Sequence, residues 1–264
     1  MLEFLHSMAP LYLLCGFVVG ALIGMTGVGG GSLMTPVLIL LFGLPPATAV
    51  GTDLIYVSVT EMAGAAIHGY NRTINWRVMG LLALGSLPTT LLTLTALYEF
   101  GLSPAAISWI ITRVLACALV LTVMLLLFRG AFSQLRTARA RRFSPKVLNR
   151  VTVASGVALG ILVPLSSVGA GAITVMMMTF LYPEMRARKI VGTDIAHAVP
   201  LTLIAGLGHG LFGSVDWHVA TSLLIGSLPG IVVGSLASFR MPDAAVRLSL
   251  AAMLLIVATK LLFS

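Results

Sequence analysis

The chain has 264 residues, of which 58% are hydrophobic and only 9% are charged, and its mean hydropathy is +1.06. A soluble domain carries about 25% charged residues, so this composition excludes one and predicts an integral membrane protein. The net charge of +8 does not indicate nucleic-acid binding, because seven of the 16 basic residues lie in one acid-free connector at 129–150. Between membrane segments such a run is typical of the cytoplasmic side.

Ten apolar segments follow one another along the chain, and their lengths and spacing predict an all-α protein. They cover roughly 8–25, 32–42, 46–69, 76–98 and 104–128, and then 151–165, 172–182, 190–210, 217–239 and 243–263. The first of them lacks a basic leader and a cleavage signal, so we expect it to belong to the mature fold. We divide the chain into a first membrane repeat (1–128), a basic cytoplasmic connector (129–150) and a second membrane repeat (151–264).

Short motifs of the first half recur 141 residues later in the second. The repeated residues are Gly51-Thr52-Asp53, His68-Gly69, Trp76 and Gly85-Ser86-Leu87-Pro88, which return as Gly192-Thr193-Asp194, His209-Gly210, Trp217 and Gly226-Ser227-Leu228-Pro229. Each copy lies in apolar sequence. Two related membrane halves are typical of secondary transporters, whose binding site lies between the repeats.

The charge distribution predicts that the second repeat begins with a hairpin. Its segment at 151–182 starts at the cytoplasmic connector and ends at a second basic cluster, at 186–189. Both ends are therefore expected on the cytoplasmic side. The two apolar pieces have about 15 and 11 residues, and each is shorter than the roughly 20 that span a bilayer. We predict a re-entrant helical hairpin with its turn at 166–171.

The first half copies this pattern with a glycine-rich turn at 26–32, but its hairpin starts and ends outside. The two repeats then have inverted topology, each being one glycine-tipped hairpin plus three transmembrane helices, and both termini are periplasmic. This arrangement places 14 of the 16 Lys and Arg residues in the cytoplasm. The alternative is eight simple spans with both termini on one side, which would place the 186–189 cluster outside.

Non-helical backbone at membrane depth is expected only where protein or a watery cavity satisfies its polar groups. Each glycine turn precedes a helical piece, and two helix amino ends that meet near the midplane suit an anion. The alternative is that the glycines only pack helices together. The candidate substrate-binding residues are Thr26, Gly27, Gly29, Gly30, Gly31, Ser32, Ser166, Ser167, Gly169, Gly171, Thr52 and Thr193.

Acids inside membrane helices are a second group of candidates. Asp53 and Asp194 either act on the solute or bind the N–H groups of the hairpin turns. Asp53, Glu61 and His68 fall within about 80° of arc on one predicted helix, and Thr202 replaces Glu61 in the second copy. The candidates for gating or proton coupling are Asp53, Glu61, Asp194 and His197. Both His68 and His209 lie near helix ends and are interpreted as interfacial, and no spacing indicates a metal site or a cofactor.

The glycine-rich stretch at 20–36, the Gly-Thr-Asp motif after it and their second copies resemble the sulfite exporter TauE/SafE family of small membrane permeases. The resemblance implies transport of small sulfur-containing anions, such as sulfite or organosulfonates, commonly as export across the bacterial inner membrane. One departure is that Ala170 and Ala172 of the second hairpin replace Gly30 and Ser32 of the first. The second backbone cradle is therefore expected to be tighter and poorer in donors.

The sequence predicts a secondary transporter that moves a small anion by alternating access at a midplane site, with the lipid bilayer as its surroundings. The alternative is a proton- or sodium-linked carrier of another small solute centred on Asp53 and Asp194. An intramembrane enzyme is disfavoured, because no nucleophile is paired with a base, and a structural scaffold gives no reason for the glycine turns. The oligomeric state stays open, and a homo-oligomer is compatible with the sequence.

Overall fold

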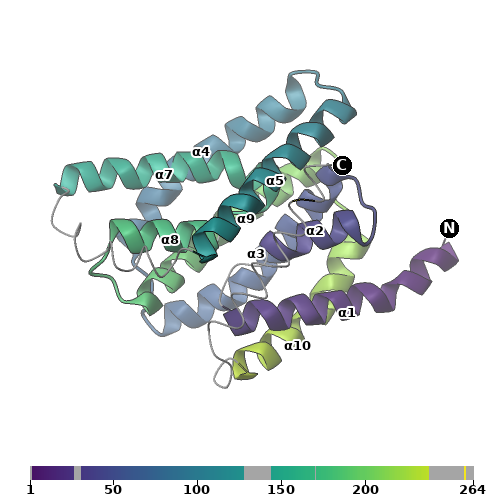
Figure 1. The fold of residues 1–264 in the computed structure, drawn as a ribbon, viewed down its shortest axis with the longest axis horizontal. Coiled ribbons are helices and arrows are strands. Elements are labelled where there is room, and N and C mark those ends of the chain that lie inside the picture. Colours follow the sequence, from purple (N-terminus) through teal and green to yellow (C-terminus); the bar gives the residue numbers. More distant parts are fainter. Residues whose placement is uncertain (1, 27–30, 128–143, 170, 238–258, 260–264) are drawn as a thin grey trace.

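The structure, a computed structural model, describes residues 2–26, 31–127, 144–169, 171–237 and 259. Within these ranges it is all-helical and contains no strand, which confirms the predicted class. Figure 1 shows the helices packed side by side. They are α1 (Leu2–Thr26), α2 (Gly31–Leu40), α3 (Pro46–Tyr70), α4 (Trp76–Glu99), α5 (Pro104–Leu127), α7 (Pro145–Ser166), α8 (Ala172–Leu181), α9 (Ala187–Leu211) and α10 (Trp217–Ala237).

Four helices in the described part of the chain are long and apolar enough to cross a membrane, namely Trp76–Glu99, Pro104–Leu125, Pro145–Ser166 and Ala187–Leu211. The helix α3 has 25 residues but is not among them. It carries Asp53 and Glu61, and both acids are buried against other helices. Its polar side chains therefore face protein and not lipid, as intramembrane acids are expected to do.

The first arm of each predicted hairpin is longer than the sequence indicated. The helix α7 has 22 residues and begins at Pro145, inside the basic connector, so the prediction of about 15 residues was wrong. Its start is fixed by Ser144, whose side chain accepts the Val147 N–H, and by proline at the first helical position. Both are strong start signals that hydropathy does not register. The second arms, α2 and α8, have only 10 residues each, as expected.

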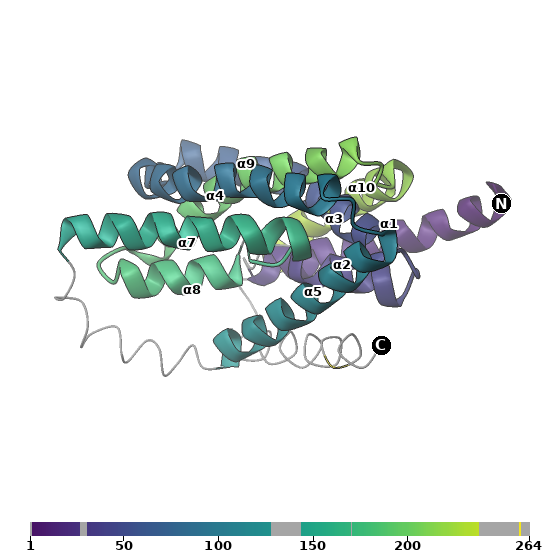
Figure 2. The ribbon, with the colours of Figure 1, turned by 90° about the horizontal axis from the view of Figure 1, so that it is seen from above.

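The helices α7 and α8 lie side by side and form a helical hairpin (Figure 2). The Tyr182 hydroxyl, at the end of α8, lies 2.6 Å from the Thr152 hydroxyl near the start of α7, so the chain returns to the side from which it came. The turn needs unusual backbone, with φ of 56° at Ser167, 132° at Gly169 and 106° at Gly171. Glycine is the residue that adopts the last two values without strain. The equivalent turn of the first half, 27–30, lies outside the described residues.

Equivalent helices of the two halves make reciprocal contacts. The helix α1 packs against α10, and α7 packs against α4 in the same way. A Cβ added to Gly16 would lie 2.3 Å from the Leu223 carbonyl oxygen, and one added to Gly156 would lie 2.2 Å from that of Leu82. Leu82 and Leu223 are themselves 141 residues apart. Glycine is required at both crossings because the helix backbones touch there.

The central helices α3 and α9 contact each other along their length and run antiparallel. Gly51, near the start of α3, contacts Ser214 just after α9, and Gly192, near the start of α9, contacts Thr73 just after α3. Equivalent helices of the two halves therefore have opposite directions.

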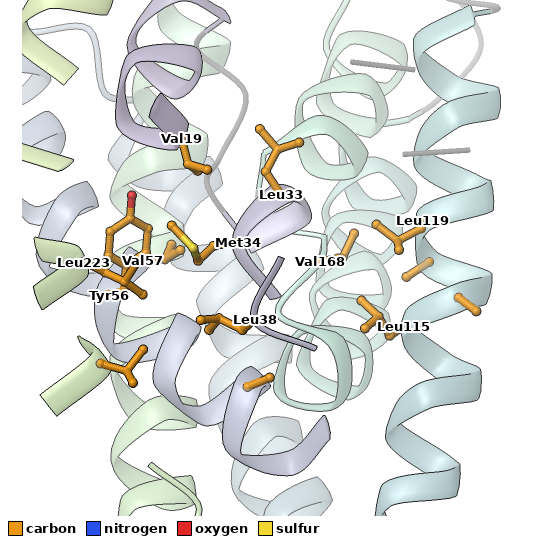
Figure 3. Close-up of a cluster of buried hydrophobic side chains, with 14 of the residues drawn as sticks. Val19, Leu33, Met34, Leu38, Tyr56, Val57, Leu115, Leu119, Val168 and Leu223 are labelled. Carbon is orange, nitrogen blue, oxygen red and sulfur yellow. The ribbon is translucent and has the colours of Figure 1, made fainter. Parts of the chain in front are cut away.

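The tip of the α7–α8 hairpin is buried among helices of the first half. Val168 belongs to one apolar cluster with Leu33 and Met34 of α2, Tyr56 of α3 and Leu119 of α5 (Figure 3). The side chain of Val168, at the tip, is only 1% exposed. The second hairpin thus ends at the junction between the halves, next to the short arm of the first hairpin.

Candidate functional site

Each aspartate of the Gly-Thr-Asp motifs is tied to the short hairpin arm of its own half. Asp53 of α3 is fully buried, and its Oδ2 accepts the Thr35 N–H at 3.1 Å and the Thr35 hydroxyl. Asp194 of α9 accepts the Gly171 N–H at 3.4 Å, at the start of α8. The structure thus brings both acids to hairpin N–H groups, which was one of the two alternatives that the sequence left open.

Each threonine of the motifs is tied instead to the opposite half. The Thr52 hydroxyl accepts the Asp216 N–H at 2.9 Å, and the Thr193 hydroxyl accepts the Asn75 N–H at 2.8 Å. Asn75 and Asp216 also cap the first turns of α4 and α10 with their side chains. The hydroxyl oxygens of Thr52 and Thr193 therefore already accept a backbone N–H each. That these two threonines also bind the substrate stays a prediction.

The motif glycines allow the halves to meet. A Cβ at Gly51 would lie 2.1 Å from the Ser214 carbonyl oxygen and 2.8 Å from the His209 Cβ. A Cβ at Gly192 would lie 2.8 Å from both His68 Nδ1 and the Thr73 carbonyl oxygen. Any side chain larger than hydrogen would force these backbones apart. In each motif the glycine thus allows the close approach, the threonine binds the opposite half and the aspartate binds the hairpin of its own half.

The interpretation of His209 as an interfacial residue was wrong, because its side chain is completely buried. Its Nε2 lies 2.8 Å from the Pro164 carbonyl oxygen, in the last turn of α7, and its Nδ1 lies 2.7 Å from the Tyr98 hydroxyl. A carbonyl only accepts, so Nε2 carries the proton and Nδ1 of the neutral ring accepts from Tyr98. His68 is only partly buried, and its Nδ1 contacts the Thr73 hydroxyl at 2.7 Å.

Several buried polar atoms near the junction have no hydrogen-bond partner among the described residues. They are Asp53 Oδ1, Tyr56 Oη, Glu61 Oε2, Ser167 Oγ and His197 Nδ1. A buried polar group without a partner costs about 1–3 kcal/mol, so such groups in a folded protein call for a bound solute or water. The Ser167 hydroxyl at the hairpin tip lies close enough to the Asp53 carboxyl to donate to it.

Tyr56 was missed by the sequence reasoning. It follows Asp53 by one helical turn, as His197 follows Asp194, so the two residues are equivalent in the repeats. His197 Nε2 lies 2.8 Å from the Ser86 hydroxyl of the opposite half. The Tyr56 hydroxyl lies near Ser227, which is the repeat equivalent of Ser86. The signal was present in the repeat itself: a polar residue stands at the same distance from both motifs.

The other predicted site residues divide between described and undescribed parts of the chain. Ser32 and Ser167 are buried, at 4% and 2% exposure. The Ser166 hydroxyl accepts the Val168 N–H at 3.1 Å and donates to the Leu162 carbonyl, so it holds the turn together. Thr26 ends α1 and Gly31 begins α2. Gly27, Gly29 and Gly30 lie outside the described residues.

Two cavities are found among the described residues, and neither is lined by a residue of the Gly-Thr-Asp motifs. One of about 510 Å³ is apolar and is lined by α5, α7 and α8, reaching Ile173 at the start of α8. The other, of about 200 Å³, lies between the starts of α4 and α7 and includes Asn75, Arg77 and Tyr182. Neither includes Asp53 or Asp194. Among the described side chains no group of three His, Cys, Asp or Glu residues could hold a metal ion.

Comparison with known proteins identifies the family to which this architecture belongs. The profile of the sulfite exporter TauE/SafE family matches residues 12–261. The chain belongs to that family. TauE/SafE proteins are membrane transporters and not enzymes, and the helices long enough to span a bilayer make this member a multi-pass membrane protein.

Relatives of this TauE/SafE chain carry transporter names. It is 39% identical over 251 residues to "Probable membrane transporter protein YjnA" of Bacillus subtilis (strain 168), covering 95% of this chain and 98% of the relative. It is 29% identical over 237 residues to "Probable membrane transporter protein YdhB" of the same organism, covering 88% and 91%. A Methanocaldococcus jannaschii protein, "Probable membrane transporter protein MJ0441", is 28% identical over 226 residues, covering 82% and 77%. No solved structure matches the chain.

Proposed function

We propose that this TauE/SafE protein is a secondary transporter that exports a small sulfur-containing anion, sulfite or an organosulfonate, across the bacterial inner membrane. The observation that carries this proposal is the second hairpin tip. A helix amino end and the buried hydroxyl groups of Ser167 and Tyr56 lie there, at the junction of the two halves. Such a site binds by replacing the water around a small solute with fixed dipoles.

The donors at this tip come from backbone and side chains. In the first turn of α8, the Thr174 and Val175 N–H groups donate to the Gly169 and Gly171 carbonyls. The N–H groups of Ala172 and Ile173, the first two residues of α8, form the amino end of the helix, which has partial positive charge. The hydroxyl groups of Ser167 and Tyr56 are buried beside the Asp53 carboxyl and Ser227, and each can turn from that neighbour to donate to an oxyanion.

Alternating access is supported by the way the halves are joined. Antiparallel equivalent helices and reciprocal contacts are what two repeats of opposite orientation produce. We propose that the halves rock about the threonine contacts to Asn75 and Asp216, and that the site opens to one side at a time. In this topology the basic connector is cytoplasmic and both termini are periplasmic.

The proposed direction follows from charge. The cytoplasmic side is electrically negative, so exit of an anion is favoured by about 2.3 kcal/mol per charge for each 100 mV. Export of this kind needs no ATP.

A cation carrier centred on Asp53 and Asp194 is less well supported. Oxygen atoms of both acids accept hydrogen bonds from N–H groups, which leaves fewer ligands for a metal cation. Sodium takes several oxygen ligands at once, as other hard cations do. The positions of the two acids favour a role in holding the hairpins.

The test uses proteoliposomes and the unpaired hydroxyls. We expect Tyr56→Phe and Ser167→Ala to lower the rate of sulfite or sulfonate flux about tenfold. We expect each variant to lose at most about 1 kcal/mol of stability, because the Ser167 and Tyr56 hydroxyls have only the Asp53 carboxyl and Ser227 as close polar neighbours, and thermal unfolding checks that both variants are folded. Tyr70→Phe, at a side chain that is 91% exposed, is the matched control and should transport normally. Wild-type flux in both site variants would contradict the assignment.

A further inference from the structure

The side chain of Glu61 occupies a special place in the fold. It lies near the middle of α3 and is only 8% exposed. On one side of it, Ile55 contacts Gly206 of α9, and on the other, Gly64 contacts Ile195. Glu61 therefore lies where the two central helices cross, at the centre of the reciprocal contacts between the halves.

Two further buried carboxyls, Asp194 and Asp53, would repel a negative charge on Glu61. Of the helices that pack against α3, α9 also carries Arg188, Lys189, His197 and His209, and α2 has no titratable residue. The titratable residues of the other described neighbours are Arg113 and Cys117 of α5, Lys146 and Arg150 of α7 and His218 of α10.

A solute anion in this region would meet three buried carboxyl groups. Asp53 and Asp194 each accept a backbone N–H, whereas Glu61 Oε2 has no partner among the described residues. A buried carboxylate without a partner is very costly, and a second negative charge beside it adds to the cost. A proton on Glu61 removes the charge and converts the group into a hydrogen-bond donor.

We propose that Glu61 takes up one proton together with the solute anion and releases it with the anion on the other side of the membrane. This inference rests on the proposed anion transport. The proton comes from the water on the side where the anion binds, and it returns to water on the opposite side, so no other reactant is needed. One net negative charge still crosses with a dianion, so the membrane potential continues to favour exit.

The two repeats differ at the position of Glu61, so the proposed proton site occurs in the first half and not in the second. The second half has Thr202 where the first has Glu61. The Thr202 hydroxyl donates to the Ala198 carbonyl of its own helix at 2.8 Å and has no acid–base function near neutral pH. A single acid on the crossing of two otherwise similar halves therefore sets a ratio of one proton per anion.

The experiment measures proton movement in proteoliposomes that contain a pH-sensitive dye. The solute is thiosulfate, or another bound anion that stays fully ionised near neutral pH. Potassium and valinomycin clamp the membrane potential, so that protons are not drawn out through the lipid and a coupled proton must move on the protein. We expect an outward thiosulfate gradient to carry protons outward in the wild type. In Glu61→Gln this proton flux should fall at least about tenfold, while thiosulfate exchange without a gradient stays within about twofold, because the amide mimics the protonated acid.

Controls separate the possible failures. Glu99→Gln, at the exposed end of α4, should keep both activities. The double variant Glu61→Thr/Thr202→Glu moves the acid to the other half and should restore proton flux even if Glu61→Gln folds poorly. Unchanged proton flux in Glu61→Gln, or anion transport without proton movement in the wild type, would overturn the inference and leave the anion transport intact. No flux of any anion in the wild type would instead overturn the proposed function.

Discussion

The Thr193 hydroxyl in α9 accepts a hydrogen bond from the backbone N–H of Asn75, 2.8 Å away and 118 positions earlier in the chain. Thr52 makes the equivalent contact with Asp216, 164 positions later. Each Gly-Thr-Asp motif thereby joins its own hairpin, through the aspartate, to the first turn of a helix in the other half.

We expect Thr193→Val and Thr52→Val each to lower the free energy of unfolding by about 1 kcal/mol, because a backbone N–H loses its acceptor. The two contacts involve separate partners, so the double variant should lose about the sum. Thermal unfolding in detergent measures this. Thr→Ser at either position keeps the hydroxyl and serves as the control, and equal loss in the serine variants would mean that the methyl group, not the hydrogen bond, matters.

Gly51→Ala and Gly192→Ala should destabilise the protein by about 1–3 kcal/mol or more, because the added Cβ overlaps atoms of the opposite half. The overlap at Gly51 is the more severe, with 2.1 Å to a backbone oxygen that cannot move freely. Gly80→Ala in α4 is the matched control, since its Cβ would meet nothing within 4 Å. A lower melting temperature for Gly80→Ala than for Gly51→Ala would contradict this description of the junction.

The sequence predicted the all-helical class, the family and the two similar halves, because apolar segments and repeated motifs are local signals. It also placed the second turn at 166–171, where the structure has positive φ at Ser167, Gly169 and Gly171. It did not predict the full length of α7, because a helix continues through charged residues when a cap and a proline start it.

The partners of the site residues could not be predicted from the sequence. Hydropathy placed His209 near a helix end, but burial depends on Tyr98 and on the end of α7, which come from distant parts of the chain. Tyr56 was overlooked because a tyrosine in an apolar segment is usually a packing residue. Only the three-dimensional contacts show that its hydroxyl and His197 occupy equivalent places.

Tyr98→Phe should lower the free energy of unfolding by about 1–3 kcal/mol, because His209 Nδ1 would remain buried without a donor. The His209 ring, which holds the end of α7 through the Pro164 carbonyl, loses its second contact, so we expect weaker anion binding as well as a lower melting temperature. His209→Ala in the same background should add little further loss through this contact, since the pair acts together. Full additivity of the two variants would show that the Tyr98–His209 contact does not contribute.

Asp53→Ala and Asp53→Asn should behave differently. The asparagine oxygen can still accept the Thr35 N–H, so Asp53→Asn should keep most of the anion flux, whereas Asp53→Ala should lose about tenfold or more because α2 is no longer held. Flux in proteoliposomes, measured with and without sodium, separates this from a cation carrier. Equal loss in both variants together with a sodium requirement in the wild type would favour the carrier.

The central claim is that a small sulfur-containing anion binds at the buried tip of the α7–α8 hairpin. The most direct measurement is the thermal shift of the purified protein with sulfite, taurine, sulfoacetate and thiosulfate, made in parallel on the wild type and on Ser167→Ala/Tyr56→Phe. The account predicts that at least one of these solutes raises the melting temperature of the wild type, and that the double variant, although folded without solute, loses that shift. No shift with any of the four, or the same shift in both proteins, would contradict it.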